Sequence, residues 1–406
     1  MLKTLNNSMA INRKKLKICF IGWANSEHVK RWVRWFAGRG HDVHLISNVY
    51  EDIPGVHVHS FQARTTADVA EDKAGKKGRL AGLIAKAKFN YLSYLRYPGY
   101  IKKTKQLLAE IKPDLLQGFY IGFAGYIGAF AGFHPFLVFT GGPDLLVFPR
   151  KFFLHRLWTK YALSKIDFLT HTSEEANQAA IDLGADPKRS RFLHIGIDLK
   201  VFNPMVDPAD TKKRLGIDGH PMILSTRGLF DRYYNISGLI RAFSLVLKEL
   251  PEARLVLKYY SAPEKDKFVR LARELGVYDK IVWAGKIDYN SMVKFYRSAD
   301  VYVSLSFTDS GPVSMLEAMA CGCVPVVSDL KNIREWVRNG ENGYLVDPGD
   351  ADSAAQAIVN ILSNRGLREQ FGQRNAAVIR EQADQEKCLG EIEKISYRLV
   401  GGGNEE

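Results

Sequence analysis

Two acidic side chains, Asp309 and Glu317, lie eight positions apart in the segment 304–329, SLSFTDSGPVSMLEAMACGCVPVVSD. The pattern places Glu317 one turn into a helix that begins at Pro312 or Val313, with Asp309 on the loop before it. A carboxylate at Glu317 can accept hydrogen bonds from the two ribose hydroxyls of a nucleotide, and one at Asp309 can accept from the hydroxyls of a sugar. Spacing alone leaves open a helix whose acidic first turn is merely stabilising.

The start of that helix has the features of a diphosphate site. A strand-like run ends near Ser306, and Gly311 and Pro312 lead from it into the helix. Proline suits the first turn because its missing N–H group would be unpaired there. We expect free backbone N–H groups of Val313 and Ser314 to point into the crevice at the carboxyl end of the strand, where open α/β sheets bind ligands and where a helix N-terminus attracts phosphate.

Three further polar residues are candidates, each with a structural alternative. His28 begins the first predicted helix and would bind the acceptor or take its proton, or would simply be a polar residue at a helix start. Asp144 follows a glycine pair at a strand end and would contact the donor sugar or the acceptor, or would cap a turn. Lys258 would be a second phosphate ligand, or a lysine at the edge of a strand.

The elements that must position these residues alternate between strand and helix. LKICFI at 16–21 and VHLIS at 43–47 are short apolar strands, and the residues between them form one apolar helical stripe, a βαβ unit that implies a parallel sheet. In the second half, strands are predicted at 222–226, 254–259, 281–284, 300–305 and 324–327, with helices at 235–248, 264–275, 289–298 and 313–320. Both halves therefore read as doubly wound α/β domains.

The domain organisation follows from length and from breaks in this alternation. The 406 residues fit two domains of about 200 residues each. Proline and glycine are dense at 196–221, and the alternation restarts after them, so we predict parts at 1–200, 201–380 and 381–406. The last part is a charged helix with a disordered tail.

Residues 115–133 carry no charged side chain, so a transmembrane helix must be considered. The stretch contains five glycines and is followed by Pro135. These residues favour a buried strand, helix and strand instead, in which the glycine spacing indicates close helix packing.

Positive charge is concentrated in the first third of the chain. Residues 1–120 carry 12 of the 13 net positive charges, and 73–105 contain ten Lys or Arg and no acidic residue. Aromatic residues lie among them: Phe89, Tyr91, Tyr94, Tyr97 and Tyr100. Such a surface suits an anionic membrane face or an acidic lipid-linked substrate, and nucleic acid less well. The alternative is a solvated helix face whose tyrosines pack inward.

The four cysteines and the N-terminus indicate a cytoplasmic protein. No cysteine or histidine cluster completes a zinc pattern. The first residues are polar and basic, and the apolar run after them is short and contains Lys17, so we expect no signal peptide. Reduced thiols in the cytosol are then expected.

The D-x7-E spacing of Asp309 and Glu317, followed by AMACGCVPVVSD, resembles the E-x7-E signature of retaining glycosyltransferases of family 4. Further segments resemble that family in the same order along the chain: IGWANSEHVKRW with RGHDVHLIS, KPDLLQG, GGPDLL, HIGIDLKVFNP, RGLFDRYYNISGLIRAF and REWVRNGENGYLVDPGD. Several ordered motifs over about residues 16–365 are far more specific than one. The resemblance implies the GT-B fold, two facing Rossmann-like domains with parallel sheets and the ligand in the cleft between them.

The resemblance also implies roles for single residues. Glu317 matches the glutamate that holds the ribose, and Asp309 matches the first acid of the signature, usually a glutamate. Arg227 matches the arginine that neutralises the diphosphate leaving group, where positive charge stabilises the charge that develops. Arg232 matches a neighbouring lysine loosely, and Gly22 matches the glycine-rich loop that approaches the diphosphate from the first domain.

Other family features map less closely. Gln117 and Phe119 stand where many members have His-x-His, and Lys258-Tyr259-Tyr260 stands where they have a glycine pair. The resemblance makes 1–200 the acceptor-binding domain and 201–380 the nucleotide-sugar-binding domain. A C-terminal helix would pack back toward the first domain.

The implied activity is transfer of a hexose-type sugar from a nucleoside diphosphate to a hydroxyl acceptor, with retention of anomeric configuration. No metal or other cofactor is expected, because Arg227 and the helix start would take the place of a metal ion. With the basic region 73–105, we expect a lipid-linked or cell-envelope glycan acceptor and a peripheral position at the inner face of the membrane. The alternatives are a nucleotide-sugar epimerase of the same fold and a non-catalytic membrane-associated partner that keeps the nucleotide pocket.

Overall fold

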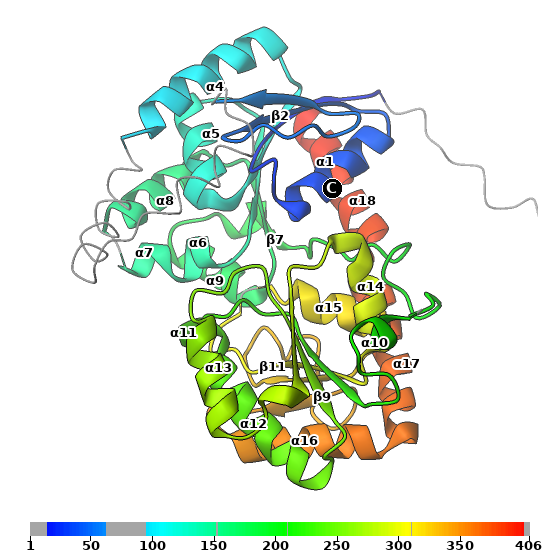
Figure 1. The fold of residues 1–406 in the computed structure, drawn as a ribbon. Coiled ribbons are helices and arrows are strands. Elements are labelled where there is room, and N and C mark those ends of the chain that lie inside the picture. Colours follow the sequence, from blue (N-terminus) through cyan, green and yellow to red (C-terminus); the bar gives the residue numbers. More distant parts are fainter. Residues whose placement is uncertain (1–13, 62–94, 152, 209, 310, 402–406) are drawn as a thin grey trace, which may run out of the picture. The chain divides into compact units, whose positions relative to one another are not determined.

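In a computed structural model of the chain, residues 14–61, 95–151, 153–208, 210–309 and 311–401 are described. The chain divides into two compact units. Unit 1 comprises Met1–Leu193 and Glu391–Glu406, and unit 2 comprises His194–Gly390. Each unit is built around its own parallel sheet with helices on both faces, as expected of doubly wound α/β domains (Figure 1).

The sheet of unit 1 has seven described strands in the order β3-β2-β1-β4-β5-β6-β7, and all the pairs are parallel. Strands β4 and β5 are buried along their whole length, as is typical of parallel strands covered on both faces. The chain order reverses between β1 and β4, and such switch points are where these sheets bind ligands. The strands are β1 (Lys17–Ile21), β2 (Asp42–Ser47), β3 (His57–Ser60), β4 (Leu115–Phe119), β5 (Phe136–Thr140), β6 (Phe168–His171) and β7 (Ser190–Phe192).

The first helix of unit 1 forms as the apolar spacing predicts. Val29, Trp32, Val33 and Phe36 are buried on one stripe, and Gly40 has a φ of 84° just after the helix ends. The described helices are α1 (Glu27–Gly38), α4 (Tyr97–Ile111), α5 (Tyr126–Ala131), α6 (Pro143–Leu146), α7 (Phe148–Lys151), α8 (Phe153–Lys165) and α9 (Glu174–Asp182), with a 3₁₀ turn η2 (Pro187–Arg189).

The sheet of unit 2 has six described strands, all parallel, in the order β10-β9-β8-β11-β12-β13. This is the strand order of a dinucleotide-binding fold, with the reversal between β8 and β11. The strands are β8 (Met222–Ser225), β9 (Arg254–Lys258), β10 (Ile281–Gly285), β11 (Val301–Ser304), β12 (Pro325–Ser328) and β13 (Tyr344–Val346). The five strands predicted in this half are confirmed, each within two residues at either end.

Helices connect these strands and are capped by side chains. Asn235, Asp288 and Asp350 accept hydrogen bonds from backbone N–H groups at the starts of α12, α14 and α16. The helices are α10 (Thr211–Arg214), α11 (Asp231–Tyr234), α12 (Ile236–Glu249), α13 (Lys265–Glu274), α14 (Tyr289–Ser298), α15 (Val313–Ala320), α16 (Ala351–Ser363) and α17 (Arg365–Gln382), with a 3₁₀ turn η3 (Tyr278–Lys280). The four helices predicted here are confirmed.

The final helix α18 (Gln385–Val400) begins in unit 2 and ends in unit 1. Its second half is tied to unit 1 by polar contacts. Glu393 accepts hydrogen bonds from Arg39 Nε at 2.9 Å and Nη2 at 3.0 Å, and it contacts His41 Nε2 at 2.9 Å. Gln117 Nε2 donates to Ser396 Oγ at 3.0 Å.

The uncharged segment 115–133 forms β4, a π-helical turn η1 (Tyr120–Gly125) and α5, as the glycine pattern indicates. Gly128 allows α5 to approach β5 closely, because a Cβ atom there would lie 2.3 Å from Phe136 Cζ. No helix in the described part of the chain is long and apolar enough to cross a membrane.

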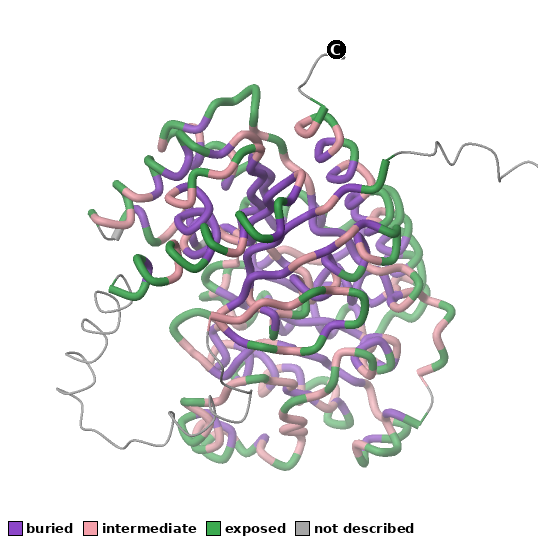
Figure 2. The backbone as a smooth tube through the Cα atoms, turned by 90° about the horizontal axis from the view of Figure 1, so that it is seen from above, coloured by how far each residue is buried: buried purple, intermediate pink, exposed green. Residues whose placement is uncertain are grey.

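Burial follows the sheets. Figure 2 shows buried residues running through the interior and exposed residues on the outer turns of the helices. Of the predicted basic and aromatic surface at 73–105, Phe89, Tyr91 and Tyr94 lie outside the described residues. Tyr97 on α4 is buried and its O–H donates to the Gly122 carbonyl at 2.6 Å. This tyrosine therefore packs inward, as the structural alternative predicts.

Candidate functional site

In unit 2, the predicted donor-binding residues gather at the carboxyl ends of three neighbouring strands. Arg227 follows β8, Lys258 ends β9, and Asp309 lies on the loop after β11. These strands are adjacent in the sheet, in the order β9-β8-β11. Because the chain order reverses at β8, the loops diverge and leave room for a ligand.

Glu317 is a buried carboxylate on α15, with 5% of its surface exposed. Both of its oxygens accept hydrogen bonds from tyrosines of α14: Tyr289 O–H donates to Oε1 and Tyr296 O–H to Oε2, each at 3.1 Å. Burial, followed by the charge of Glu317, raises the pKa of Tyr296 well above its ordinary value, so its hydroxyl stays protonated. An ionised carboxylate only accepts hydrogen bonds, so Glu317 is an acceptor group that the two hydroxyls hold in a fixed orientation.

Arg227 and Asp309 form an ion pair between guanidinium Nη2 and carboxylate Oδ2. Arg227 Nε also donates to Ser304 Oγ at 2.8 Å, and the guanidinium lies 5.8 Å from the Tyr234 ring centre. Burial opposes the charge of Arg227, but the Asp309 carboxylate outweighs it and the pKa of Arg227 is raised. The site therefore holds a fixed positive charge, and an anionic ligand can bind the Arg227 guanidinium beside Asp309 or in place of it.

The loop between Asp309 and α15 is held by hydrogen bonds of its own. Gly311 N–H donates to Asp309 Oδ1 at 3.2 Å, and Asn332 Nδ2 donates to the Asp309 carbonyl at 2.9 Å. Val313 N–H donates to the Gly311 carbonyl at 2.8 Å. The expectation that this N–H group is free is therefore wrong, because Pro312 (φ −79°, ψ 48°) closes a three-residue turn.

Two other predicted donor residues differ in their surroundings. Lys258 is partly buried, and burial lowers its pKa, while nearby Glu317 raises it and Lys286 lowers it further. Lys258 therefore belongs to the same electrostatic neighbourhood as Glu317. Arg232 on α11 is exposed, and its guanidinium stacks 5.8 Å from the Tyr233 ring centre. No ion pair of Arg232 is present among the described residues.

In unit 1, three loops meet at the carboxyl ends of the adjacent strands β1, β4 and β5. Gly22 follows β1, and a Cβ atom there would lie 3.1 Å from Phe119 Cδ2 and 3.2 Å from Val29 Cγ2. The turn after β4 packs on the loop after β5, since a Cβ atom at Gly141 would lie 2.2 Å from Tyr120 Cε1. Glycine at these two positions therefore allows the loops to pack closely on neighbouring side chains of unit 1.

Asp144 lies in this second group of loops and is 5% exposed. Its Oδ2 accepts a hydrogen bond from Ile121 N–H at 2.7 Å, whereas its Oδ1 is buried and has no hydrogen-bond partner in the described part of the chain. Burial raises the pKa of Asp144 to about 6, although backbone N–H groups oppose part of the effect. An orphaned buried carboxylate oxygen indicates a ligand or a role beyond capping a turn.

His28 lies at the start of α1, next to the loop after β1. Its Nδ1 is buried and has no partner among the described residues. Burial lowers the pKa of His28 to about 4, with Arg31 adding to the effect and Glu27 opposing it. The imidazole is therefore neutral at pH 7 and can accept a hydrogen bond from a hydroxyl group.

Gln117 and Phe119 replace a histidine pair of the family pattern and face the interior of unit 1. Gln117 is 2% exposed and holds Ser396 of α18. Phe119 is also 2% exposed and stacks with Phe20 at 6.1 Å between ring centres. These positions support the fold of unit 1.

Four residues of the unit 2 site were not predicted from the sequence: Tyr289, Tyr296, Ser304 and Asn332. A signal was present for the tyrosines, because residues seven apart on a helix share one face. No pattern in the sequence indicates Ser304 or Asn332, which join the site only through the fold.

Two family models match the chain. A model described as glycosyl transferase 4-like matches residues 17–173, and one described as glycosyl transferases group 1 matches residues 208–378. Among curated relatives, the N-acetyl-alpha-D-glucosaminyl L-malate synthase of Bacillus anthracis is 26% identical over 259 residues, which are 64% of this chain and 66% of that protein. The matches to this and to other curated relatives span 44% to 66% of the relatives' own lengths.

Two solved structures show the same fold over almost the whole chain. The sucrose-phosphate synthase of Thermosynechococcus elongatus has a TM-score of 0.76 and is 19% identical. The match covers 96% of this chain and 100% of the synthase chain. HepE of Anabaena in complex with UDP-glucose has a TM-score of 0.74 and 16% identity, covering 95% of this chain and 100% of the other.

Proposed function

The chain belongs to family 4 of the glycosyltransferases, with the GT-B fold, and on that premise we propose that it moves a sugar from a nucleoside diphosphate to a hydroxyl acceptor with retention of configuration. One observation carries the proposal: the buried Glu317 carboxylate is held by two tyrosine hydroxyls in the same unit as the paired Arg227 and Asp309. Ribose hydroxyls, a diphosphate and a sugar are the groups that this set would bind.

Unit 2 residues would hold the donor. Glu317, held in orientation by Tyr289 and Tyr296, would accept hydrogen bonds from the ribose hydroxyls. Arg227 would bind the diphosphate, so that its ion pair with Asp309 is exchanged for a phosphate contact. Asp309 would then accept hydrogen bonds from the transferred sugar. Gly311, Val313 and Ser314 would offer backbone N–H groups to the phosphates once the turn at Pro312 opens.

The reaction breaks the bond between the anomeric carbon and the diphosphate oxygen and forms a bond from that carbon to the acceptor oxygen. The acceptor would attack the face from which the diphosphate leaves, and a phosphate oxygen would take the acceptor proton. Arg227 would stabilise the negative charge that develops on the leaving group. No residue of the chain is assigned as a covalent nucleophile.

Unit 1 residues would serve the acceptor. The orphaned Oδ1 of Asp144 would accept a hydrogen bond from an acceptor or donor hydroxyl, and neutral His28 would do the same. Lys258 and Arg232 of unit 2 remain candidates for further phosphate contacts.

For the acceptor we propose a lipid-linked or envelope glycan, with the protein at the inner face of the membrane. Support comes from the charge of 73–105, of which Lys102, Lys103 and Lys105 lie on the described α4. Reversing these three charges to glutamate should reduce sedimentation with vesicles of anionic phospholipid and leave nucleotide binding unchanged. Unchanged sedimentation would refute the membrane proposal and favour a small soluble acceptor, such as the malate in the name of the Bacillus anthracis relative.

The donor site is tested by thermal unfolding with UDP, GDP, ADP, dTDP and CMP, on the parent and on Glu317→Ala. A ligand at about 100 times its Kd stabilises a protein by roughly 2.7 kcal/mol. The proposal predicts a clear rise in Tm with one diphosphate, lost in the variant. A nucleotide pocket with no response to any of the five would contradict it. UDP is the first candidate, because HepE of Anabaena binds UDP-glucose.

A further inference from the structure

Strands β2 and β3 place four polar side chains on one face of the unit 1 sheet. Side chains alternate along a strand, so Asp42 and His44 share a face of β2, and His57 and His59 share a face of β3. The register pairs His44 with His57 and Ile46 with His59, which brings the two sets together. The spacings Asp-x-His and His-x-His thereby become one cluster.

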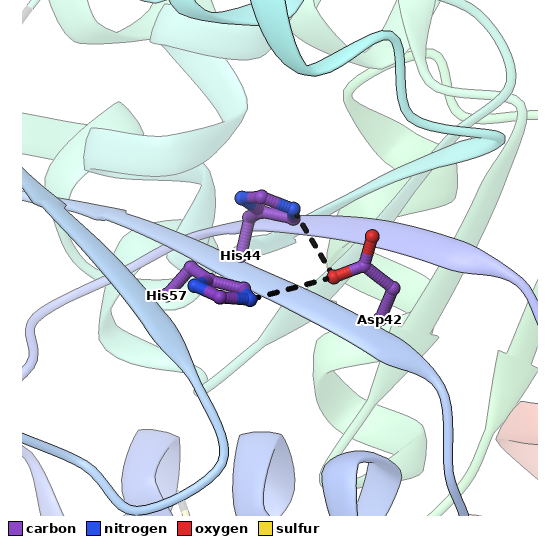
Figure 3. A group of neighbouring side chains, drawn as sticks. All are labelled: Asp42, His44 and His57. Atoms are coloured by element: carbon purple, nitrogen blue, oxygen red, sulfur yellow. Dashed lines mark ion pairs between the residues drawn. The ribbon is translucent and has the colours of Figure 1, made fainter.

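We propose that Asp42, His44 and His57 form a binding site for a Zn²⁺ ion. Figure 3 shows both imidazoles directed at the same carboxylate oxygen. His44 Nε2 lies 3.3 Å and His57 Nε2 lies 3.8 Å from Asp42 Oδ1, and all three ligand atoms lie within 4.8 Å of one another. Ligand atoms around tetrahedral zinc lie about 3.4 Å apart, given bonds of about 2.0–2.1 Å.

The residues around the three ligands suit a metal ion. His44 Nδ1 lies 3.0 Å from His59 Nε2, so His59 can accept the Nδ1 proton in the tautomer that leaves the Nε2 lone pair for the metal. Lys17 Nζ lies 3.7 Å from Asp42 Oδ2, so the other carboxylate oxygen is compensated and Oδ1 remains available. The His57 side chain is 68% exposed, so it can rotate to bring Nε2 closer to the other two ligand atoms.

The chemistry of the donor set selects zinc among common ions. Two imidazoles and one carboxylate suit a transition metal better than Mg²⁺ or Ca²⁺, which prefer oxygen ligands alone. Softer thiolate ligands do not compete, because the four cysteines are buried. His41 does not join the site, because it is buried and its Nε2 contacts Glu393 at 2.9 Å. Three protein ligands leave a fourth position for water.

The position of the site separates it from sugar transfer. Asp42 and His57 are the first residues of their strands, so the cluster lies at the amino ends. Ligands of parallel sheets bind at the carboxyl ends, where Gly22 and Asp144 lie. A bound ion would instead tie the edge strand β3, only four residues long, to β2. The inference therefore does not depend on the proposed transferase activity.

The test is a zinc titration of chelator-treated, tag-free protein in competition with a chromogenic chelator. The parent should bind one Zn²⁺ per chain, and both His57→Ala and Asp42→Asn should lose this binding. His59→Ala should weaken it by about 10- to 100-fold, as expected for a partner that orients a ligand. His134→Ala is the matched control, since His134 forms a histidine–carboxylate pair with Asp167 at 2.7 Å that no second imidazole of the described residues completes.

His57 is exposed, so its alanine variant should fold, and a parent-like Tm without metal checks this point. Zinc should raise the Tm of the parent and of His134→Ala, and should leave that of His57→Ala unchanged. Nucleotide binding should be the same in all these variants. Absence of zinc binding by the parent, or equal binding by the parent and His57→Ala, would overturn the proposal.

Discussion

Glutamine in place of Glu317 removes one acceptor and the charge while it keeps the shape of the side chain. The two carboxylate oxygens each accept one tyrosine hydroxyl at 3.1 Å, and in the proposed donor site they would also accept from the ribose hydroxyls. In Glu317→Gln the amide nitrogen can only donate, so one ribose hydrogen bond is lost and the other loses its charge assistance.

The magnitude follows from the strength of such bonds. A hydrogen bond to a charged group contributes about 1.5–3 kcal/mol, which corresponds to an increase in the nucleotide Kd of about 10- to 150-fold. The tyrosine hydroxyl that faces the amide can rotate to accept, so the fold should persist and Tm without ligand should change little. Isothermal titration calorimetry with the diphosphate selected by the nucleotide panel measures the change.

A chemical double-mutant cycle separates ribose contact from general damage to the site. A 2′,3′-dideoxy form of the same diphosphate lacks both ribose hydroxyls, so its Kd should differ much less between the parent and Glu317→Gln than the Kd of the normal nucleotide. Tyr289→Phe, which leaves the carboxylate intact, should raise Kd by less than about tenfold. If the variant weakens both nucleotides by the same factor, Glu317 does not contact the ribose.

Three further predictions concern stability. Asp309→Asn should lower the free energy of unfolding by about 3–5 kcal/mol, because Arg227 keeps its charge without a partner and the two side chains are only 13% and 10% exposed. Added nucleoside diphosphate should restore part of the lost stability. Stability equal to that of the parent in chemical denaturation would contradict this prediction. Burial raises the pKa of Asp144 to about 6, above its ordinary 3.8, so its protonation stabilises the fold below pH 4 and this contribution is lost as pH rises through 6. Relative to Asp144→Asn, the parent should thus lose roughly 3 kcal/mol between pH 4 and 7, and parallel pH profiles of the two proteins would show that the carboxyl is not perturbed. Gly128→Ala should cost about 1–3 kcal/mol through overlap with Phe136, whereas Gly99→Ala, with no atom within 4 Å, should not destabilise; equal Tm values for the two variants would refute the packing argument.

The fold was predictable because parallel strands and their helices have distinct patterns. Strands such as β8 and β11 are buried on both faces, so they occur as short apolar runs between helices with polar stripes. The same rule explains why site candidates follow strands: Arg227 comes after β8 and Asp309 after β11. The sequence places each residue at a strand end, and the sheet order then brings those ends together.

Other features depend on which strands and helices become neighbours. Arg227 and Asp309 are 82 positions apart, and no local pattern indicates that they form an ion pair. The two tyrosines that hold Glu317 come from a different helix, and the turn at Pro312 depends on backbone angles. The cluster of Asp42, His44 and His57 was not predicted either. Its residues come from two separate motifs, Asp-x-His and His-x-His, which only the register of β2 and β3 brings together.

Sugar transfer with retention of configuration can be tested without knowledge of the acceptor, because water can slowly take the acceptor's place. Proton NMR can follow release of sugar from the nucleotide sugar, such as UDP-α-glucose, fast enough to see the first anomer formed. A retaining transferase should release nucleotide and form the α anomer first, and Glu317→Ala should lose this release. Formation of the β anomer first would contradict retention. If the parent releases no sugar from any nucleotide sugar whose nucleotide it binds, transfer itself is contradicted.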